Sequence, residues 1–163
     1  MFVQCRALFM RETDRLPVDA ELDFSQVDYR GTQPFATPVR VIGEITNRAG
    51  VVELDAEAVF EYSGACDRCL TPFVRSHTVP VRHVLVTSLE NEDSDFVLLD
   101  EYRLDLDDLV LADILLELPS KDLCKEDCRG LCPYCGKNLN EGLCGCKTDR
   151  EDPRLAVLKQ LLN

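Results

Sequence analysis

Apolar and polar residues alternate strictly between residues 52 and 62 of the chain. Acidic side chains fill several of the positions between the apolar ones, which are Val52, Leu54, Ala56, Ala58, Phe60 and Tyr62. A period of two residues is typical of a strand with one buried face. A second alternation, Val39, Val41 and Ile45, comes before it, across the turn-forming residues 47–50. The pattern predicts an antiparallel hairpin.

A third extended run covers residues 73–87, with Pro80 as a possible kink because proline cannot donate to a sheet ladder. The Cys-x-x-Cys pair Cys66 and Cys69 therefore falls on a turn between two strands. A further strand is expected near Phe2 to Met10, and residues 18–33 are too mixed to assign.

Two helices follow from spacing and capping. Asp105 or Asp107 can cap a helix that ends before Pro119 and buries residues three and four apart, namely Leu106, Leu109, Val110, Ile114 and Leu118. Asp152 and Pro153 start a terminal helix. Without βαβ alternation, the predicted class is α+β. We expect a mainly antiparallel sheet with one packed helix in a core domain over residues 1–119. A cysteine-rich zinc-binding lobe with the C-terminal helix is expected over residues 120–163.

Charge limits the possible partners. The chain has 18 Lys and Arg against 30 Asp and Glu, a net charge of −12. This charge opposes the phosphate attraction on which most nucleic-acid binding depends. Residues 90–117 hold eleven carboxylates and one base, Arg103. No run is long enough to span a bilayer and the first residues lack an export leader, so we expect a cytoplasmic protein with no membrane partner.

Nine cysteines are an odd number, which in the reducing cytoplasm favours metal binding over disulfides. Four of them can converge on one ion within a short segment: Cys132, Cys135, Cys144 and Cys146. Two remote pairs make a second set: Cys66, Cys69, Cys124 and Cys128. Other pairings, such as Cys66 and Cys69 with Cys144 and Cys146, stay open. Cys5 stands alone, and we expect it to be a small buried side chain.

Structural zinc at one or two four-cysteine sites is the favoured cofactor, because such sites leave no open position for water. A simple iron-sulfur protein is the main alternative. Cys128, Cys132 and Cys135 also have the CxxxCxxC spacing of radical-SAM enzymes, which need a large barrel after the motif. Too little chain follows for that fold. A thioredoxin-like role for Cys66 and Cys69 would need a helix after the pair.

Catalysis has little support in the sequence. His77 and His83 have no nearby nucleophile, and Asp105, Asp107 and Asp108 suit the start of a helix better than a site. There is no glycine-rich phosphate loop. We therefore expect no enzyme and no catalytic residue.

Three segments resemble the signature blocks of the YceD family, the large ribosomal RNA subunit accumulation proteins. They are CDRCLTPF at 66–73, LPSKDLCKEDCRGLCPYCGKNLNEGLCGC at 118–146 and DPRLAVLKQLL at 152–162. The resemblance implies a role in synthesis, processing or stability of large-subunit (23S) ribosomal RNA. It also implies that the cysteines in these blocks are metal ligands, and it supplies no catalytic residue.

Two modes of action fit this resemblance. An acidic surface over residues 90–117 would hold a basic large-subunit ribosomal protein or dock on a ribosomal precursor particle. The alternative is direct binding of ribosomal RNA through the bases of the lobe, which are Lys121, Lys125, Arg129, Lys137, Lys147 and Arg150.

Overall fold

The computed structural model describes residues 1–88 and 95–146. The predicted terminal helix and the carboxylates Glu90, Glu92 and Asp93 lie outside this part. Seven strands are present in it: β1 (Phe2–Gln4), β2 (Arg15–Leu22), β3 (Val39–Arg48), β4 (Val51–Ala65), β5 (Pro72–Val86), β6 (Val97–Leu98) and β7 (Arg103–Asp105). Two helices accompany them: α1 (Arg6–Phe9) and α2 (Leu106–Glu117).

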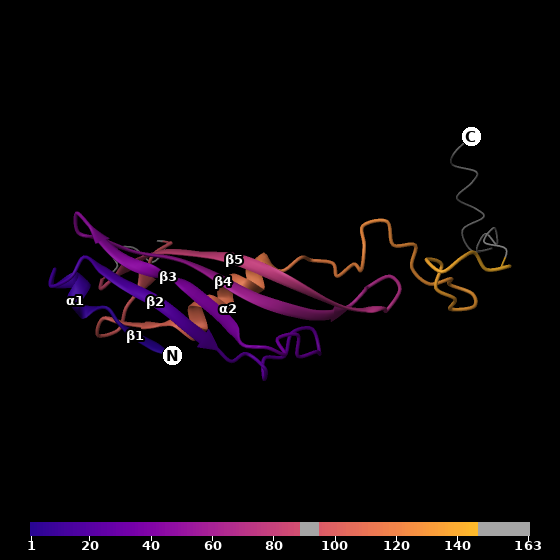
Figure 1. Cartoon of the computed structure of the whole chain (residues 1–163), viewed down its shortest axis with the longest axis horizontal. Coiled ribbons are helices and arrows are strands. Elements are labelled where there is room, and N and C mark those ends of the chain that lie inside the picture. Colours follow the sequence, from indigo (N-terminus) through magenta and orange to yellow (C-terminus); the bar gives the residue numbers. More distant parts are fainter. Residues whose placement is uncertain (89–94, 147–163) are drawn as a thin grey trace, which may run out of the picture.

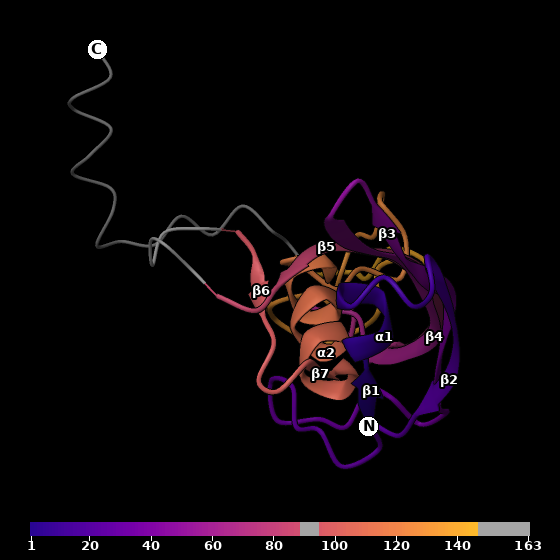
Figure 2. The same ribbon diagram turned by 90° about the vertical axis from the view of Figure 1, so that its left-hand side faces the viewer.

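The fold is mostly β. Five strands form one sheet in the order β2-β3-β4-β5-β6, antiparallel except for the short parallel pair β5-β6. A second sheet pairs β1 with β7. Figure 2 shows the large sheet curving around one side of α2. In Figure 1 the chain after α2 runs on past the tip of the β4-β5 hairpin.

The hairpin predicted from residues 39–62 is confirmed as β3-β4. Its connection is the two-residue turn Ala49-Gly50, and both residues have positive φ, 56° and 95°. This is the type of turn whose twist matches that of the flanking strands. The amide of Gly50 also donates to the side-chain oxygen of Asn47 at 2.9 Å, which closes the turn.

The hydrophobic core lies between the concave face of the sheet and α2. The alternating apolar residues of β4 are buried, from Val52 to Tyr62. Helix α2 contributes Leu106, Val110 and Ile114 to the same core. Asp105 is its N-cap and accepts a hydrogen bond from the amide of Asp108, so one of the two predicted caps is correct. Neither α1 nor α2 has the length and hydropathy needed to cross a bilayer.

The N-terminal region differs from the expectation of one strand over residues 2–10. That prediction was wrong beyond Gln4, because the chain turns at Cys5 into α1 and buries Cys5 and Leu8 together. The unassigned stretch begins inside β2, which pairs along its full length with β3. Pro80 is paired with Glu57 inside β5. On the other side of β5, β6 pairs only with Leu85 and Val86, so Pro80 lies in a part of β5 that β6 does not reach.

Candidate metal centres

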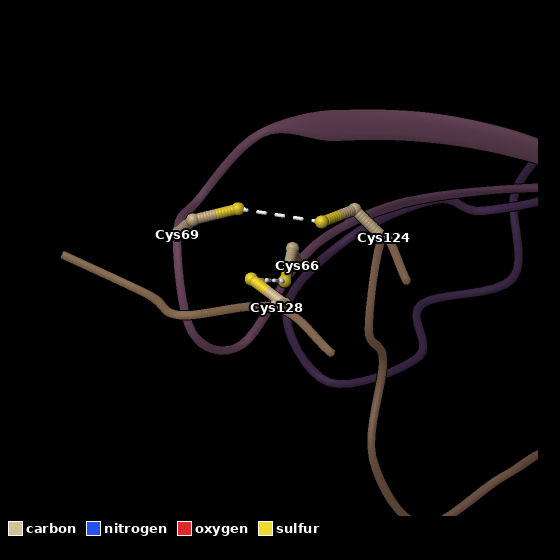
Figure 3. A group of neighbouring side chains, drawn as sticks. All are labelled: Cys66, Cys69, Cys124 and Cys128. Carbon is tan, nitrogen blue, oxygen red and sulfur yellow. Dashed lines mark hydrogen bonds between the residues drawn. The ribbon is translucent and has the colours of Figure 1, made fainter. Parts of the chain in front are cut away.

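The first cysteine cluster joins two regions distant in the sequence. Cys66 and Cys69 lie on the β4-β5 turn, whereas Cys124 and Cys128 come from the segment after α2 (Figure 3). The Sγ atoms of Cys69 and Cys124 are 3.5 Å apart, and those of Cys66 and Cys128 are 3.7 Å apart. All four sulfurs lie within 4.8 Å of one another. Of the pairings that the sequence left open, the structure selects this one.

These separations suit a single tetrahedral ion. A metal–sulfur bond of about 2.3 Å places the sulfurs of a tetrahedral site about 3.8 Å apart. A disulfide would bring two of them to about 2.05 Å, and the cysteines are free thiols. In a four-iron cluster each thiolate binds a different iron, which would spread the four sulfurs more widely. The donor set therefore fits one soft divalent ion.

The second cluster is built within one short segment. It contains Cys132, Cys135, Cys144 and Cys146, whose sulfurs also lie within 4.8 Å of one another. Cys132 is buried and Cys135 is exposed, so this cluster is more open to solvent than the first. The two clusters use all eight cysteines predicted as ligands, in the two sets that the spacing indicated.

The Cys-x-x-Cys turn of the first cluster has a defined backbone. The amide of Cys66 donates to the carbonyl of Thr71 at 2.9 Å, and the amide of Leu70 donates to the carbonyl of Cys66 at 2.8 Å. Leu70 has a φ of 58°, a left-handed conformation that is unfavourable for a residue with a side chain. The turn thus places a strained residue directly after its second cysteine.

The turn of the second cluster repeats this backbone. The amide of Cys132 donates to the carbonyl of Lys137 at 2.8 Å, and the amide of Gly136 donates to the carbonyl of Cys132 at 2.9 Å. Gly136 has a φ of 72° and occupies the place of Leu70. Both turns aim backbone amides at the first cysteine, which is the arrangement of a zinc knuckle. Two copies of one turn favour the same kind of ligand at both clusters.

The thiols within each cluster differ in acidity. Burial raises the pKa of Cys66, but backbone amides, that of Cys124 first, outweigh it and lower the value to about 6. Backbone amides, that of Cys135 first, lower the pKa of Cys132 to about 6. Burial and neighbouring thiols raise the pKa of Cys124 to about 12. A hydrogen bond with Cys135, and then burial, raise that of Cys146 to about 12. A bound dication would offset the crowded negative charge and displace the remaining protons.

A polar clasp of backbone and side-chain hydrogen bonds connects the two segments that form the first cluster. The amide of Asp67 donates to the carbonyl of Asp122 at 2.7 Å, and the amide of Asp122 donates to the Asp67 carboxylate at 2.8 Å. The carboxylate of Asp122 is buried and accepts the Tyr62 hydroxyl at 2.8 Å. Burial, with the hydrogen bond to Asp122, raises the pKa of Tyr62, so its hydroxyl stays a donor. Arg30 lies 3.8 Å from the same carboxylate.

Two arginines add to this clasp. Arg68 donates to the carbonyl of Cys128 at 2.8 Å. Arg75 donates to the carbonyls of Leu123 and Cys124, the latter at 2.8 Å. The Arg68 bond is partly buried and the Arg75 bonds are exposed, and together they attach the segment of Cys124 and Cys128 to the β4-β5 hairpin. None of the clasp residues was identified from the sequence, although Asp67 and Arg68 lie between the first two cysteines.

The other residues considered in the sequence lie away from the clusters. Cys5 is fully buried in the core, and burial raises its pKa to about 11, as expected of a structural cysteine. His77 stacks on Phe60 with ring centroids 5.6 Å apart. The His83 Nε2 and Asp113 Oδ2 atoms are 2.7 Å apart, next to the helix rather than to a nucleophile.

Several bacterial proteins are similar to this chain. Uncharacterized proteins of Mycobacterium tuberculosis and Mycobacterium bovis are each 31% identical over 104 residues, 61% of this chain and 50% of each relative. This chain thus spans about half the length of those relatives. The uncharacterized protein YlbN of Bacillus subtilis is 28% identical over 129 residues, 77% of this chain and 75% of that protein. No solved structure matches this one.

One protein family matches a large part of the chain. It is described as large ribosomal RNA subunit accumulation protein YceD, and it matches residues 54–162. This range is more than half of the chain and contains both cysteine clusters. The resemblance in the three sequence blocks is thereby confirmed, and the chain belongs to the YceD family.

Proposed function

We propose that this protein is a non-enzymatic factor in the biogenesis of the large ribosomal subunit, where it supports synthesis, processing or stability of 23S ribosomal RNA. The observation that carries the proposal is the match over residues 54–162 to a family described as large ribosomal RNA subunit accumulation protein. The fold is consistent with a binding role, because the clustered cysteines are all engaged with one another.

In this proposal each cluster holds one structural zinc ion. The four sulfurs of a cluster have the spacing of a tetrahedral thiolate site and leave no position for a reacting water. Zinc would fix the lobe over residues 120–163 to the core over residues 1–119. Such ions contribute on the order of 10 kcal/mol to folding of small zinc modules. In this proposal the zinc ions are therefore structural and not catalytic.

The proposed partner surface is acidic. Asp100, Asp105, Asp107 and Asp113 have internal ion-pair partners, which are Arg103, the N-terminal amine and His83. Four other carboxylates of the segment are exposed and form no ion pair with any described residue: Asp95, Glu101, Asp108 and Glu117. Exposed carboxylates of this kind attract basic proteins. We infer that they contact a basic large-subunit ribosomal protein or a protein face of a precursor particle.

Depletion of the protein in its source cell tests the pathway. We expect 23S ribosomal RNA to fall relative to 16S, with precursor large subunits accumulating on sucrose gradients. Unchanged rRNA ratios and gradients after complete depletion would contradict the proposal. Complementation with a quadruple variant tests the acidic surface. The variant carries D95N, E101Q, D108N and E117Q. Full rescue by this variant would contradict the proposed partner surface, but it would not contradict the role in large-subunit biogenesis.

Direct RNA binding is the second candidate, because the lobe exposes bases beside an aromatic ring. Lys121, Lys125, Arg129 and Lys137 are exposed, and 53% of Tyr134 is accessible for stacking. The Lys125 Nζ and Asp127 Oδ1 atoms are 3.7 Å apart, so the carboxylate offsets part of the attraction between Lys125 and a phosphate. Charge reversal at Lys125, Arg129 and Lys137 separates the candidates. Loss of association with precursor particles in that variant would favour RNA contact over the acidic surface.

A further inference from the structure

One polar side chain connects the two cysteine clusters. Asn140 lies between Cys135 and Cys144, in the loop that closes the second cluster. Its side-chain nitrogen Nδ2 is 3.3 Å from the Sγ atom of Cys128, which belongs to the first cluster. An amide that donates to a ligating sulfur stabilises the thiolate and fixes its orientation. Asn140 thus supports a cluster to which it contributes no ligand.

The orientation of this side chain is determined by its other contacts. The oxygen Oδ1 of Asn140 accepts the backbone amide of Arg129 at 3.0 Å. Because only an oxygen can accept that bond, the nitrogen must be the atom that faces the sulfur. The Asn140 backbone amide and its Nδ2 also donate to Oδ1 of Asn138, at 3.0 and 2.8 Å. The donor is therefore held in place by its own loop.

The backbone of that loop is attached to the chain between the clusters. The amide of Leu139 donates to the carbonyl of Gly130 at 2.9 Å, and Leu131 is bridged to Asn138. Gly130 in turn packs on the first turn, where an added Cβ would lie 2.9 Å from the carbonyl oxygen of Arg68. The position of Asn140 consequently depends on how well the segment between Cys135 and Cys144 is ordered.

We propose that Asn140 is a positioning residue that couples the two clusters, so that metal binding at either one raises the affinity of the other. This inference rests on the proposed function, in that it takes each cluster to bind an ion. An ion at the second cluster orders the loop and holds the amide against Cys128. By thermodynamic reciprocity, an ion at the first cluster favours the ordered loop and so the second ion.

The test uses the full chain loaded with ¹¹³Cd²⁺, whose NMR spectrum gives each cluster its own resonance. A variant with both C135S and C144S lacks the second site and thereby assigns the first. N140D keeps the acceptor for Arg129 but removes the donor. The control is E141Q, one residue further along and exposed. Chelator competition then gives the affinity of the first cluster for Cd²⁺ in each protein.

N140D is expected to weaken Cd²⁺ binding at the first cluster about 10-fold, within the range for a group that supports a ligand. E141Q should have no effect. Removing the second site should weaken binding similarly, and the combination should weaken it no further than either change alone. Additive effects, or an unchanged first-site affinity in N140D, would overturn the coupling.

A measurement on the unaltered protein guards against a variant that misfolds. A through-bond coupling between ¹¹³Cd at the first cluster and the side-chain amide protons of Asn140 is expected, because the hydrogen bond passes through Cys128. If two ions bind but that coupling is absent, the proposed role of Asn140 is refuted and the two metal sites are not. A wild-type chain that binds no ion would instead refute the metal sites on which the inference stands.

Discussion

The Sγ atoms of Cys69 and Cys124 lie 3.5 Å apart, although 55 positions separate the two residues in the sequence. One residue belongs to the turn after β4 and the other to the segment after α2. Any ion bound between them would connect the tip of the long hairpin to the end of the core helix. This relationship makes the first cluster a tertiary cross-link, whereas all four cysteines of the second cluster come from one short segment.

We expect C69S to lower the zinc content of the purified protein from two ions to one. The serine hydroxyl is a much poorer ligand than a thiolate, and three sulfurs hold zinc less tightly than four. Elemental analysis of freshly purified protein gives the stoichiometry. C5A is the matched control, because Cys5 is buried in the core away from both clusters and its loss should leave two ions.

The clasp at Asp122 is expected to stabilise the protein with or without metal. Y62F removes the hydroxyl that donates to the buried Asp122 carboxylate at 2.8 Å. It should lower the free energy of unfolding by about 1–3 kcal/mol, the cost of an unsatisfied buried acceptor. Urea denaturation before and after chelation measures this. A loss that appears only in the metal-loaded protein would show that the clasp does not act independently.

Leu70 should be replaceable by glycine with a gain in stability. Its φ of 58° costs a residue with a side chain roughly 1–2 kcal/mol, and glycine avoids this strain. Part of the gain is lost, because glycine also raises the conformational entropy of the unfolded chain. Because 66% of the Leu70 side chain is exposed, little burial is lost. We expect L70G to raise the free energy of unfolding by about 0.5–1 kcal/mol. The reciprocal change G136L should destabilise the second turn. Destabilisation by L70G, or no loss of stability in G136L, would contradict the shared geometry.

The metal-free protein should become more stable as pH rises from 6 to 9. In the folded state the pKa of Cys66 and of Cys132 is lowered from 9.0 to about 6. The unfolded chain therefore binds more protons in this window, which favours the folded state as pH increases. Above pH 9 the trend should reverse, because Cys124 and Cys146 have a folded pKa of about 12.

Urea midpoints of chelated, reduced protein at pH 6, 7.5, 9 and 10.5 measure this dependence. The double variant C66S and C132S serves as the control, since it lacks the two acidic thiols. Its midpoint should rise much less between pH 6 and 9 than that of the unaltered protein. A smaller rise is still expected, because the hydrogen bond with the Thr71 side chain lowers the pKa of Cys69 as well. A rise of equal size in that variant would assign the effect to groups other than Cys66 and Cys132.

Cys5 should react much more slowly than the exposed Cys135. It is fully buried and its pKa is raised to about 11, so very little thiolate is present near neutral pH. After chelation, a disulfide reagent should modify Cys135 early and Cys5 only on unfolding. Mass spectrometry of the labelled peptides identifies the protected residue. Early labelling of Cys5 would contradict its place in the core.

Local patterns were enough to predict several parts of this fold. The alternation over residues 52–62 located β4 and the hairpin with β3, since a buried face repeats every second residue. Asp105 located the start of α2, since a cap needs only its neighbours. Cys132 and Cys135 form the same turn that their spacing indicates, because its hydrogen bonds close within six residues.

Other features were decided by tertiary structure alone. The boundary between β1 and α1 depends on burying Cys5 and Leu8 under the sheet, and β2 is defined by its pairing with β3. The contact of Tyr62 with Asp122 joins residues 60 positions apart. Periodicity reports which face of an element is buried, but not what lies against it. The sequence by itself thus determined the β3-β4 hairpin, the start of α2 and the donor atoms, whereas strand register and the course of the chain after α2 decided which sulfurs, carboxylates and amides meet.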